Sequence, residues 1–314
     1  MAHEVQTMAY AGEVPWHGLG NQLAPNQPLE IWQRQAGMDW AIESSPVHYQ
    51  SKDQMRQFND AKVLYRSDSG EALSVVSNRY QVVQPREVLE FYRDLVDMGG
   101  FQLETAGVLK SGRKLWALAR TGQELMLKGN DLVKGYLLLA TACDGTLATT
   151  AQFTSVRVVC QNTLAIATSD GQGAIKVPHS TKFDADLVKK QLGIGISSWQ
   201  RFVYDMRKLS DRQVNPFEAR RYLVDLLGDA DLPFHEQPNS KTLNRVFDLF
   251  DGQGKGAELA SSNGTAFGLL NSVTQFIDHE RRARSVDNRI DSAWFGQGAA
   301  TKTKALEQAL LLTA

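Results

Sequence analysis

The chain has 314 residues, 42% of them hydrophobic, and a formal net charge of −1 at pH 7. This content supports a sizeable core and excludes an intrinsically disordered protein. The two cysteines, Cys143 and Cys160, lie 17 positions apart without a CxxC pair, which favours a reducing cytoplasm over a disulfide scaffold or structural zinc site. We expect neither a secretory signal in Met1–Tyr10 nor the roughly 20 apolar residues of a membrane span.

The first 60 residues predict an irregular N-terminal arm followed by a short helix and a strand. Tyr10–Pro28 is rich in Gly, Pro and Asn, so we expect an irregular segment, held to another surface by Tyr10 and Trp16. Pro28–Gly37 predicts a helix that ends at its glycine. Loose alternation over Asp39–His48 predicts a strand.

Residues 61–210 predict an α+β core with hairpins. The expected strand pairs are Lys62–Arg66 with Leu73–Val83, Phe101–Leu109 with Lys114–Arg120, and Val133–Ala142 with Leu147–Val159. Asp144-Gly145 in the last pair is a type I′ turn signal. Between the first two pairs, Pro85 is expected to open a helix that ends at Gly99-Gly100.

The chain after the third hairpin predicts mainly helix. Cys160–Ser169 suggests one or two helical turns, Ile175–Val177 a last strand, and Asp184 to about Leu209 one long helix. Residues 211–314 read as helices joined by glycine-rich loops. The fold class is therefore α+β, with antiparallel β-hairpins packed with helices and a helical C-terminal portion. We expect three parts, at 1–60, 61–210 and 211–314.

Sequence patterns for catalysis are weak. Gly252–Gly256 (GQGKG) resembles a phosphate loop, but no strand is predicted before it, and Gly256 stands where Ser or Thr would bind Mg²⁺. The six histidines form no HxxxH or HExxH pair, and no GxSxG elbow occurs. Cys160 lies in an apolar run typical of a buried thiol. We therefore expect no enzyme activity, no metal and no cofactor.

Charge is distributed unevenly along the chain. Residues 101–210 carry 14 Lys/Arg against 8 Asp/Glu, whereas 1–100 and 211–314 have net charges of −5 and −2. Cations and aromatic residues share strand faces by period 2, an arrangement suited to single-stranded nucleic acid. The candidate DNA-binding residues are Lys110, Arg113, Lys114, Trp116, Lys134, Tyr136, Phe153, Arg157, Lys176 and Lys182. The alternative is an ordinary solvated hairpin whose aromatic residues lie in the core.

A second basic cluster comprises Arg281, Arg282 and Arg284. It follows an apolar helical pattern, and arginines near a helix C-terminus stabilise the helix dipole. Contacts with DNA or with another protomer are the functional alternatives for this cluster.

Three stretches carry a family resemblance. They are MAHEVQTMAYAGEVPWHGLG, FTSVRVVCQNTLAIA and NGTAFGLLNSVTQFIDHERRARSVDNRIDSAWFG. They resemble the phage- and plasmid-borne family described as domain of unknown function 932, over nearly the whole chain. The resemblance implies a bacterial cytoplasm and phage or plasmid DNA metabolism, and it supplies no catalytic residues. The order of basic hairpins and a long helix is also similar in outline to Redβ-type annealing proteins.

These observations predict an ATP-independent, single-stranded-DNA-binding protein of the annealing and recombination type. It would assemble into a homo-oligomeric ring or filament in the bacterial cytoplasm, without a membrane partner. One alternative is a mobile-element protein that binds a host protein partner through Trp16 and His17. A DNA-processing enzyme is the second alternative, and it would require a carboxylate metal cluster.

Overall fold

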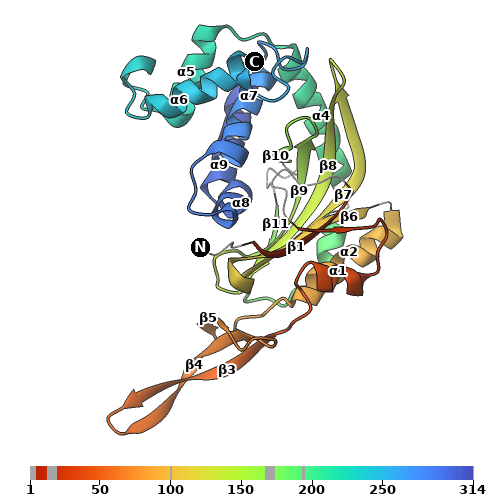
Figure 1. Cartoon of the computed structure of the whole chain (residues 1–314), viewed down its shortest axis with the longest axis vertical. Helices are drawn as coiled ribbons and strands as arrows, with labels where there is room; N and C mark the ends of the chain where they lie inside the picture. Colours follow the sequence, from red (N-terminus) through yellow and green to blue (C-terminus); the bar gives the residue numbers. More distant parts are fainter. Residues whose placement is uncertain (1–4, 13–19, 100, 167–173, 193–194, 314) are drawn as a thin grey trace. The chain divides into compact units, whose positions relative to one another are not determined.

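The computed structural model describes residues 5–12, 20–99, 101–166, 174–192 and 195–313. Antiparallel strands and their packed helices occupy the first part of the chain, and consecutive helices follow (Figure 1). The prediction of an α+β fold with a helical C-terminal portion is therefore confirmed. Trp16 and His17 lie outside the described residues.

The strands form two sheets. One has the order β10-β9-β8-β7-β6-β1-β2 with β11 also beside β9, and the other has the order β3-β4-β5. The strands are β1 Val5–Ala11, β2 Asn21–Leu23, β3 Ile42–Ser51, β4 Gln54–Arg66, β5 Ala72–Ser77, β6 Gln102–Leu109, β7 Lys114–Leu127, β8 Asp131–Ala142, β9 Thr149–Arg157, β10 Asn162–Ala165 and β11 Ile175–Val177. The helices are α1 Leu29–Gln35, α2 Pro85–Gly99, α3 Ala185–Leu192, α4 Gly195–Asp211, α5 Pro216–Leu227, α6 Ser240–Asp248, α7 Ala266–Gln275, α8 Val286–Phe295 and α9 Gln297–Leu311.

The chain divides into two compact units that are not consecutive in sequence. Unit 1 comprises Met1–Gly122, Tyr136–Phe153 and Gly171–Gly195, and unit 2 comprises Gln123–Gly135, Thr154–Asp170 and Ile196–Ala314. The long strands β7, β8 and β9 each contribute residues to both units. The two units do not follow the boundaries expected at 60 and 210, because β7, β8 and β9 each run from one unit into the other.

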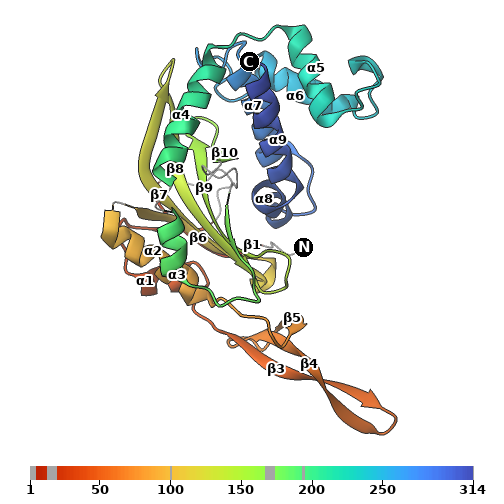
Figure 2. The same ribbon diagram turned by 180° about the vertical axis from the view of Figure 1, so that it is seen from behind.

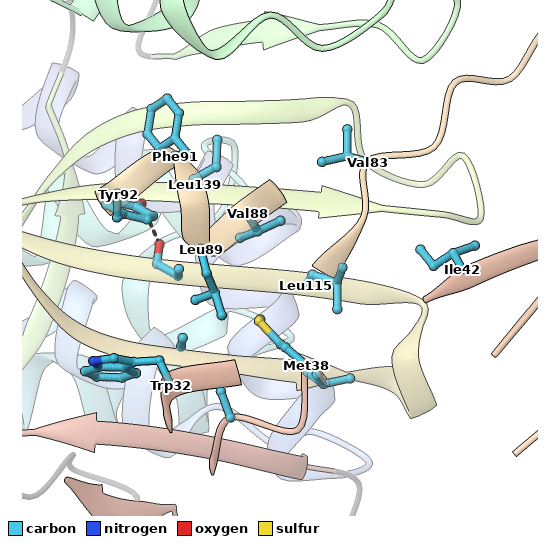
Figure 3. Packing of buried hydrophobic residues seen from close by; sticks show 14 of the residues in the cluster. Trp32, Met38, Ile42, Val83, Val88, Leu89, Phe91, Tyr92, Leu115 and Leu139 are labelled. Atoms are coloured by element: carbon cyan, nitrogen blue, oxygen red, sulfur yellow. Dashed lines mark hydrogen bonds between the residues drawn. The ribbon is translucent and has the colours of Figure 1, made fainter. Parts of the chain in front are cut away.

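The core of unit 1 forms where α1, α2 and α3 pack on one face of the sheet. Pro85 opens α2, and the Gln84 N–H donates to the Glu87 carboxylate at 2.7 Å. Figure 3 shows Leu89 and Tyr92 of α2 packed against strand residues such as Leu115. The buried Tyr92 hydroxyl donates to the Ala117 carbonyl at 2.8 Å, which joins the helix to β7. Figure 2 shows α3 on the same face of this sheet.

Several predicted elements differ in the structure. The segment Tyr10–Pro28 was predicted to be irregular, but it contains the end of β1 and all of β2. These two strands pair with each other, and β1 also pairs with β6. Residues 162–165 form strand β10 rather than a helical turn. Over the expected long helix the structure describes α3 and α4, and residues 193–194 lie outside the described residues. Asp144 does not have the positive φ that a type I′ turn requires, and its carboxylate instead accepts from the Thr146 N–H at 3.0 Å.

Candidate nucleic-acid interface

The turn between β6 and β7 is the first part of the candidate site. Lys110, Ser111 and Gly112 all have positive φ, and a Cβ at Gly112 would come within 3.1–3.2 Å of Trp40 and Leu73. The turn therefore requires glycine at this position, whereas Lys110 and Ser111 adopt a conformation that is uncommon for their residue types. It leaves Arg113 exposed and Lys110 half-buried.

The same turn is connected to the β8–β9 connection. The Cys143 N–H donates to the Arg113 carbonyl at 2.9 Å, and Ser74 Oγ donates to the Cys143 carbonyl at 2.6 Å. On the other side of this connection, His179 Nε2 lies 3.0 Å from the Leu147 carbonyl oxygen. The ring of His179 also stacks on Tyr80, with centroids 4.4 Å apart. These contacts fix three loops of unit 1 around one turn.

Four exposed cations lie on these loops and on the adjoining strand. Arg79 precedes Tyr80, Arg113 follows the β6–β7 turn, Lys176 lies on β11 opposite Thr150, and Lys182 precedes α3. We call Arg79, Arg113, Lys176 and Lys182 the basic end of unit 1. The strand order β7-β8-β9-β11 corresponds to about 14 Å across three strand spacings. This width suits contacts to more than one phosphate of a nucleic-acid backbone.

Acidic residues near the basic end are engaged in local hydrogen bonds. Asp144 accepts from the Thr146 N–H and hydroxyl, at 3.0 and 2.6 Å. Asp184 accepts from the Leu187 N–H at 3.0 Å at the start of α3. Both carboxylates thus have hydrogen-bond donors within their own turns.

The aromatic residues predicted to stack on bases do not form an exposed platform. Trp116 is 2% exposed, and its ring lies against Gly107, 3.2 Å from a Cβ built there. Tyr136 is 4% exposed and donates to the Glu104 carboxylate at 2.9 Å. Phe153 is half-buried and packs on the apolar core. The prediction of exposed stacking is therefore wrong for Trp116 and Tyr136, because folding covers the sheet face that they occupy.

Three predicted phosphate contacts are also buried. Lys114 and Lys134 are 3% and 8% exposed, and period-2 alternation places them on the same faces as Trp116 and Tyr136. Arg157 is 4% exposed in unit 2. The prediction of surface cations is wrong for these residues, whereas Arg113, Lys176 and Lys182 remain exposed.

Arg157 is part of a buried ionic cluster in unit 2. Its Nη2 lies 2.7 Å from the Asp131 carboxylate, and its Nε donates to both oxygens of that group at 2.9 Å. Nη2 also donates to the Gly256 carbonyl and Ser262 Oγ, at 2.9 and 2.8 Å. Ser261 Oγ donates to Asp131 at 2.5 Å. The guanidinium is thus surrounded by protein acceptors and holds the 256–262 loop to β8 and β9.

A second buried cluster holds α9 and the helical turn Phe276–Glu280, which follows α7, to strand β10. Lys302 Nζ donates to the Asp278 carboxylate at 2.6 Å and to Thr163 Oγ1 at 2.7 Å. His279 Nε2 lies 3.1 Å from Asn162 Oδ1, and burial lowers the pKa of His279. A cavity of about 20 Å³ beside these residues is lined partly by Asn162 and Thr163. It has room for about one water molecule, which is too small for a substrate.

The arginine cluster at 281–284 lies in the connection between α7 and α8. The Arg281 N–H donates to the Phe276 carbonyl at 2.6 Å, and its side chain is half-buried. Arg282 and Arg284 are exposed. Their position after a helical segment fits the helix-dipole interpretation, and the contact with DNA or a protomer stays a prediction.

Part of each buried cluster comes from stretches that carry the family resemblance. Arg157, Asn162 and Thr163 belong to FTSVRVVCQNTLAIA, and Asp278 and His279 belong to the stretch that begins at Asn263. The family described as Domain of unknown function (DUF932) matches residues 72–294. The chain belongs to the DUF932 family.

The DUF932 match includes residues of both compact units and all four members of the basic end. It starts at β5 and ends within α8, so the β3–β4 hairpin precedes it. Neither the curated proteins nor the solved structures contain a match to the chain. Among the described residues, no group of three His, Cys, Asp or Glu is arranged to hold a metal ion. Within the same residues, every helix is too short or too polar to cross a membrane.

Two surface features were missed by sequence reasoning. Arg79 lies outside the basic segment, and the contacts of its loop with His179 and with the Ala142 carbonyl bring it to the basic end. The β3–β4 hairpin reverses at Lys52-Asp53, with Lys52 at φ 55° where a turn signal would place Gly or Asn. The apolar residues Met55 and Phe58 do not alternate and no glycine marks the turn, so the local sequence gave no hairpin signal here.

Proposed function

We propose that this DUF932 protein binds single-stranded DNA through the basic end and promotes annealing of complementary strands without ATP. The observation that carries the proposal is the gathering of Arg79, Arg113, Lys176 and Lys182 around the β8–β9 connection. These residues come from three separate segments, and their loops are joined by hydrogen bonds. Lys and Arg neutralise backbone phosphates whatever the base sequence, which is the kind of binding that annealing requires.

The small number of exposed cations supports an assembled form of the protein. One protomer offers a weak site, whereas a ring or filament would place many such sites along one strand and raise the overall affinity. The strand would contact the basic end through its phosphates and keep its bases available for pairing. Phage or plasmid recombination in a bacterial cytoplasm is the setting that the proposal assumes.

Fluorescence anisotropy with a labelled 30-nucleotide thymidine strand, titrated at several salt concentrations, tests the proposal. The variant Arg113→Ala/Lys176→Ala/Lys182→Ala should bind more weakly. Its slope of log K against log salt should fall in magnitude by about 2, since each single-strand phosphate contact contributes roughly 0.7. The matched control is Lys208→Ala/Arg221→Ala/Lys241→Ala, which removes three exposed cations of unit 2.

Two results would contradict the proposal. The first is no binding by the wild-type protein at low salt. The second is equal salt dependence for the wild-type protein and the basic-end variant. Light scattering with and without the strand measures assembly, and a fluorescence assay with complementary strands measures annealing in the absence of ATP.

A further inference from the structure

The β3–β4 hairpin extends beyond the third strand of its sheet. Strand β5 pairs with Ala61–Tyr65 of β4, whereas residues 54–58 of β4 pair with β3 alone. We call the paired residues 47–58 the arm. Figure 1 shows the arm projecting from the rest of unit 1. A two-stranded ribbon exposed on both faces has little core of its own, so large apolar side chains on it are available to a ligand.

One face of the arm carries aromatic residues and an arginine together. Val47 is paired with Phe58 and Tyr49 with Arg56, so all four side chains lie on the same face. Tyr49 and Phe58 are 47% and 45% exposed, and Arg56 is exposed. Directly opposed Cβ atoms are about 5 Å apart and diagonal ones about 7–8 Å. Two exposed rings on one diagonal, with a cation next to both, suit a stacked base and its neighbouring phosphate.

The charge of the arm and its attachment favour nucleic acid as the occupant of this face. The arm carries two basic residues, Lys52 and Arg56, and one acidic residue, Asp53. At the base of the hairpin, Lys62 Nζ donates to the Tyr80 carbonyl at 3.0 Å, next to Arg79 of the basic end. The base of the hairpin is therefore joined to the loop that carries Arg79.

We infer that the arm is a base-stacking element for single-stranded nucleic acid, with Tyr49 and Phe58 stacking on bases and Arg56 contacting a phosphate. This inference rests on the proposed function, because the basic end supplies the backbone contacts beside which the arm acts. The basic end binds phosphates, whereas the arm distinguishes a strand with bases from a bare sugar–phosphate chain.

The test compares binding to two DNA strands of equal length. One strand is made of thymidine and the other of abasic sugar–phosphate units. Tyr49→Ala/Phe58→Ala should weaken binding to the thymidine strand at least about tenfold and leave binding to the abasic strand unchanged. The basic-end variant should weaken both. Tyr49→Trp/Phe58→Trp should retain binding, because tryptophan also stacks.

Two matched controls separate stacking from general loss of apolar surface. Met55→Ala removes a side chain that is 67% exposed on the opposite face of the arm, and Phe217→Ala removes an aromatic ring that is 74% exposed on α5. Both controls should bind as the wild-type protein does. Circular dichroism of each variant confirms that it is folded.

The outcomes distinguish the inference from the proposed function. If the wild-type protein binds thymidine and the alanine arm variant binds it equally well, the arm inference is wrong and the proposed function stands. If the arm variant changes the oligomeric state in light scattering but not the preference for bases, the arm contacts a protein, and the inference is again wrong. If the wild-type protein binds neither strand, the proposed function fails first and the inference fails with it.

Discussion

Replacing Arg157 by leucine should destabilise the protein strongly without acting through DNA. The substitution removes the bonds to Asp131, Gly256 and Ser262 and leaves a carboxylate that is fully buried, with Ser261 still donating to it. Breaking a buried ion pair on one side costs about 3–5 kcal/mol, roughly a hundredfold or more in the folding equilibrium constant. The exposed Arg113→Ala should change stability by no more than about 0.5 kcal/mol.

Guanidinium unfolding followed by circular dichroism measures this difference. The double variant Asp131→Leu/Arg157→Leu should recover much of the lost stability, because an apolar pair avoids the unpaired buried charge. The reasoning is refuted if Arg157→Leu unfolds at the wild-type midpoint while binding single-stranded DNA more weakly. That result would mean that the guanidinium reaches phosphate, as the sequence first indicated.

Three further predictions concern groups in the interior. Burial lowers the pKa of His279 below 6.5, so the unfolded chain binds the extra proton and the free energy of unfolding should decrease as pH falls through 6.5. In His279→Gln that pH dependence should be smaller, and an unchanged pH profile would contradict it. Burial raises the pKa of Cys143 to about 12 and of Cys160 to about 11, so mass spectrometry should find iodoacetamide labelling at pH 8 only after unfolding. In Gly268→Ala the new Cβ would overlap the Ser262 carbonyl oxygen, so the melting temperature should fall. A melting temperature equal to that of the wild type would contradict this clash.

The elements that could be predicted have local signals. Pro85 and Gly99 bound α2, and Asp68-Ser69-Gly70 marks the turn before β5. The arm reverses at Lys52, a residue type with no turn preference, so its outer half could not be recognised. Strand β10 follows Gln161, which has φ 55°, and its pairing with β9 replaces the helical turn that composition suggested.

The candidate site was predicted only in part because burial depends on distant residues. Period 2 places Lys114 and Trp116 on one face, but no local pattern says that folding covers this face. Arg157 is bonded to Ser262, 105 positions away, so its sequence neighbours give no sign of an ion cluster. Arg113 and Lys182 remained exposed because they lie in connections rather than in the middle of strands.

The discontinuous make-up of unit 2 has a consequence for synthesis on the ribosome. Asp131 emerges 130 residues before Ser261, its hydrogen-bond donor in the folded unit. At bacterial translation rates of about 5–20 residues per second, that interval is roughly 6–26 s. During it, Asp131 and then the later strand segments of unit 2 leave the ribosome before their helical cover has been made. Nascent chains arrested between these two points should therefore be protease-sensitive and should engage chaperones, and compactness should be gained late, as the last helices emerge.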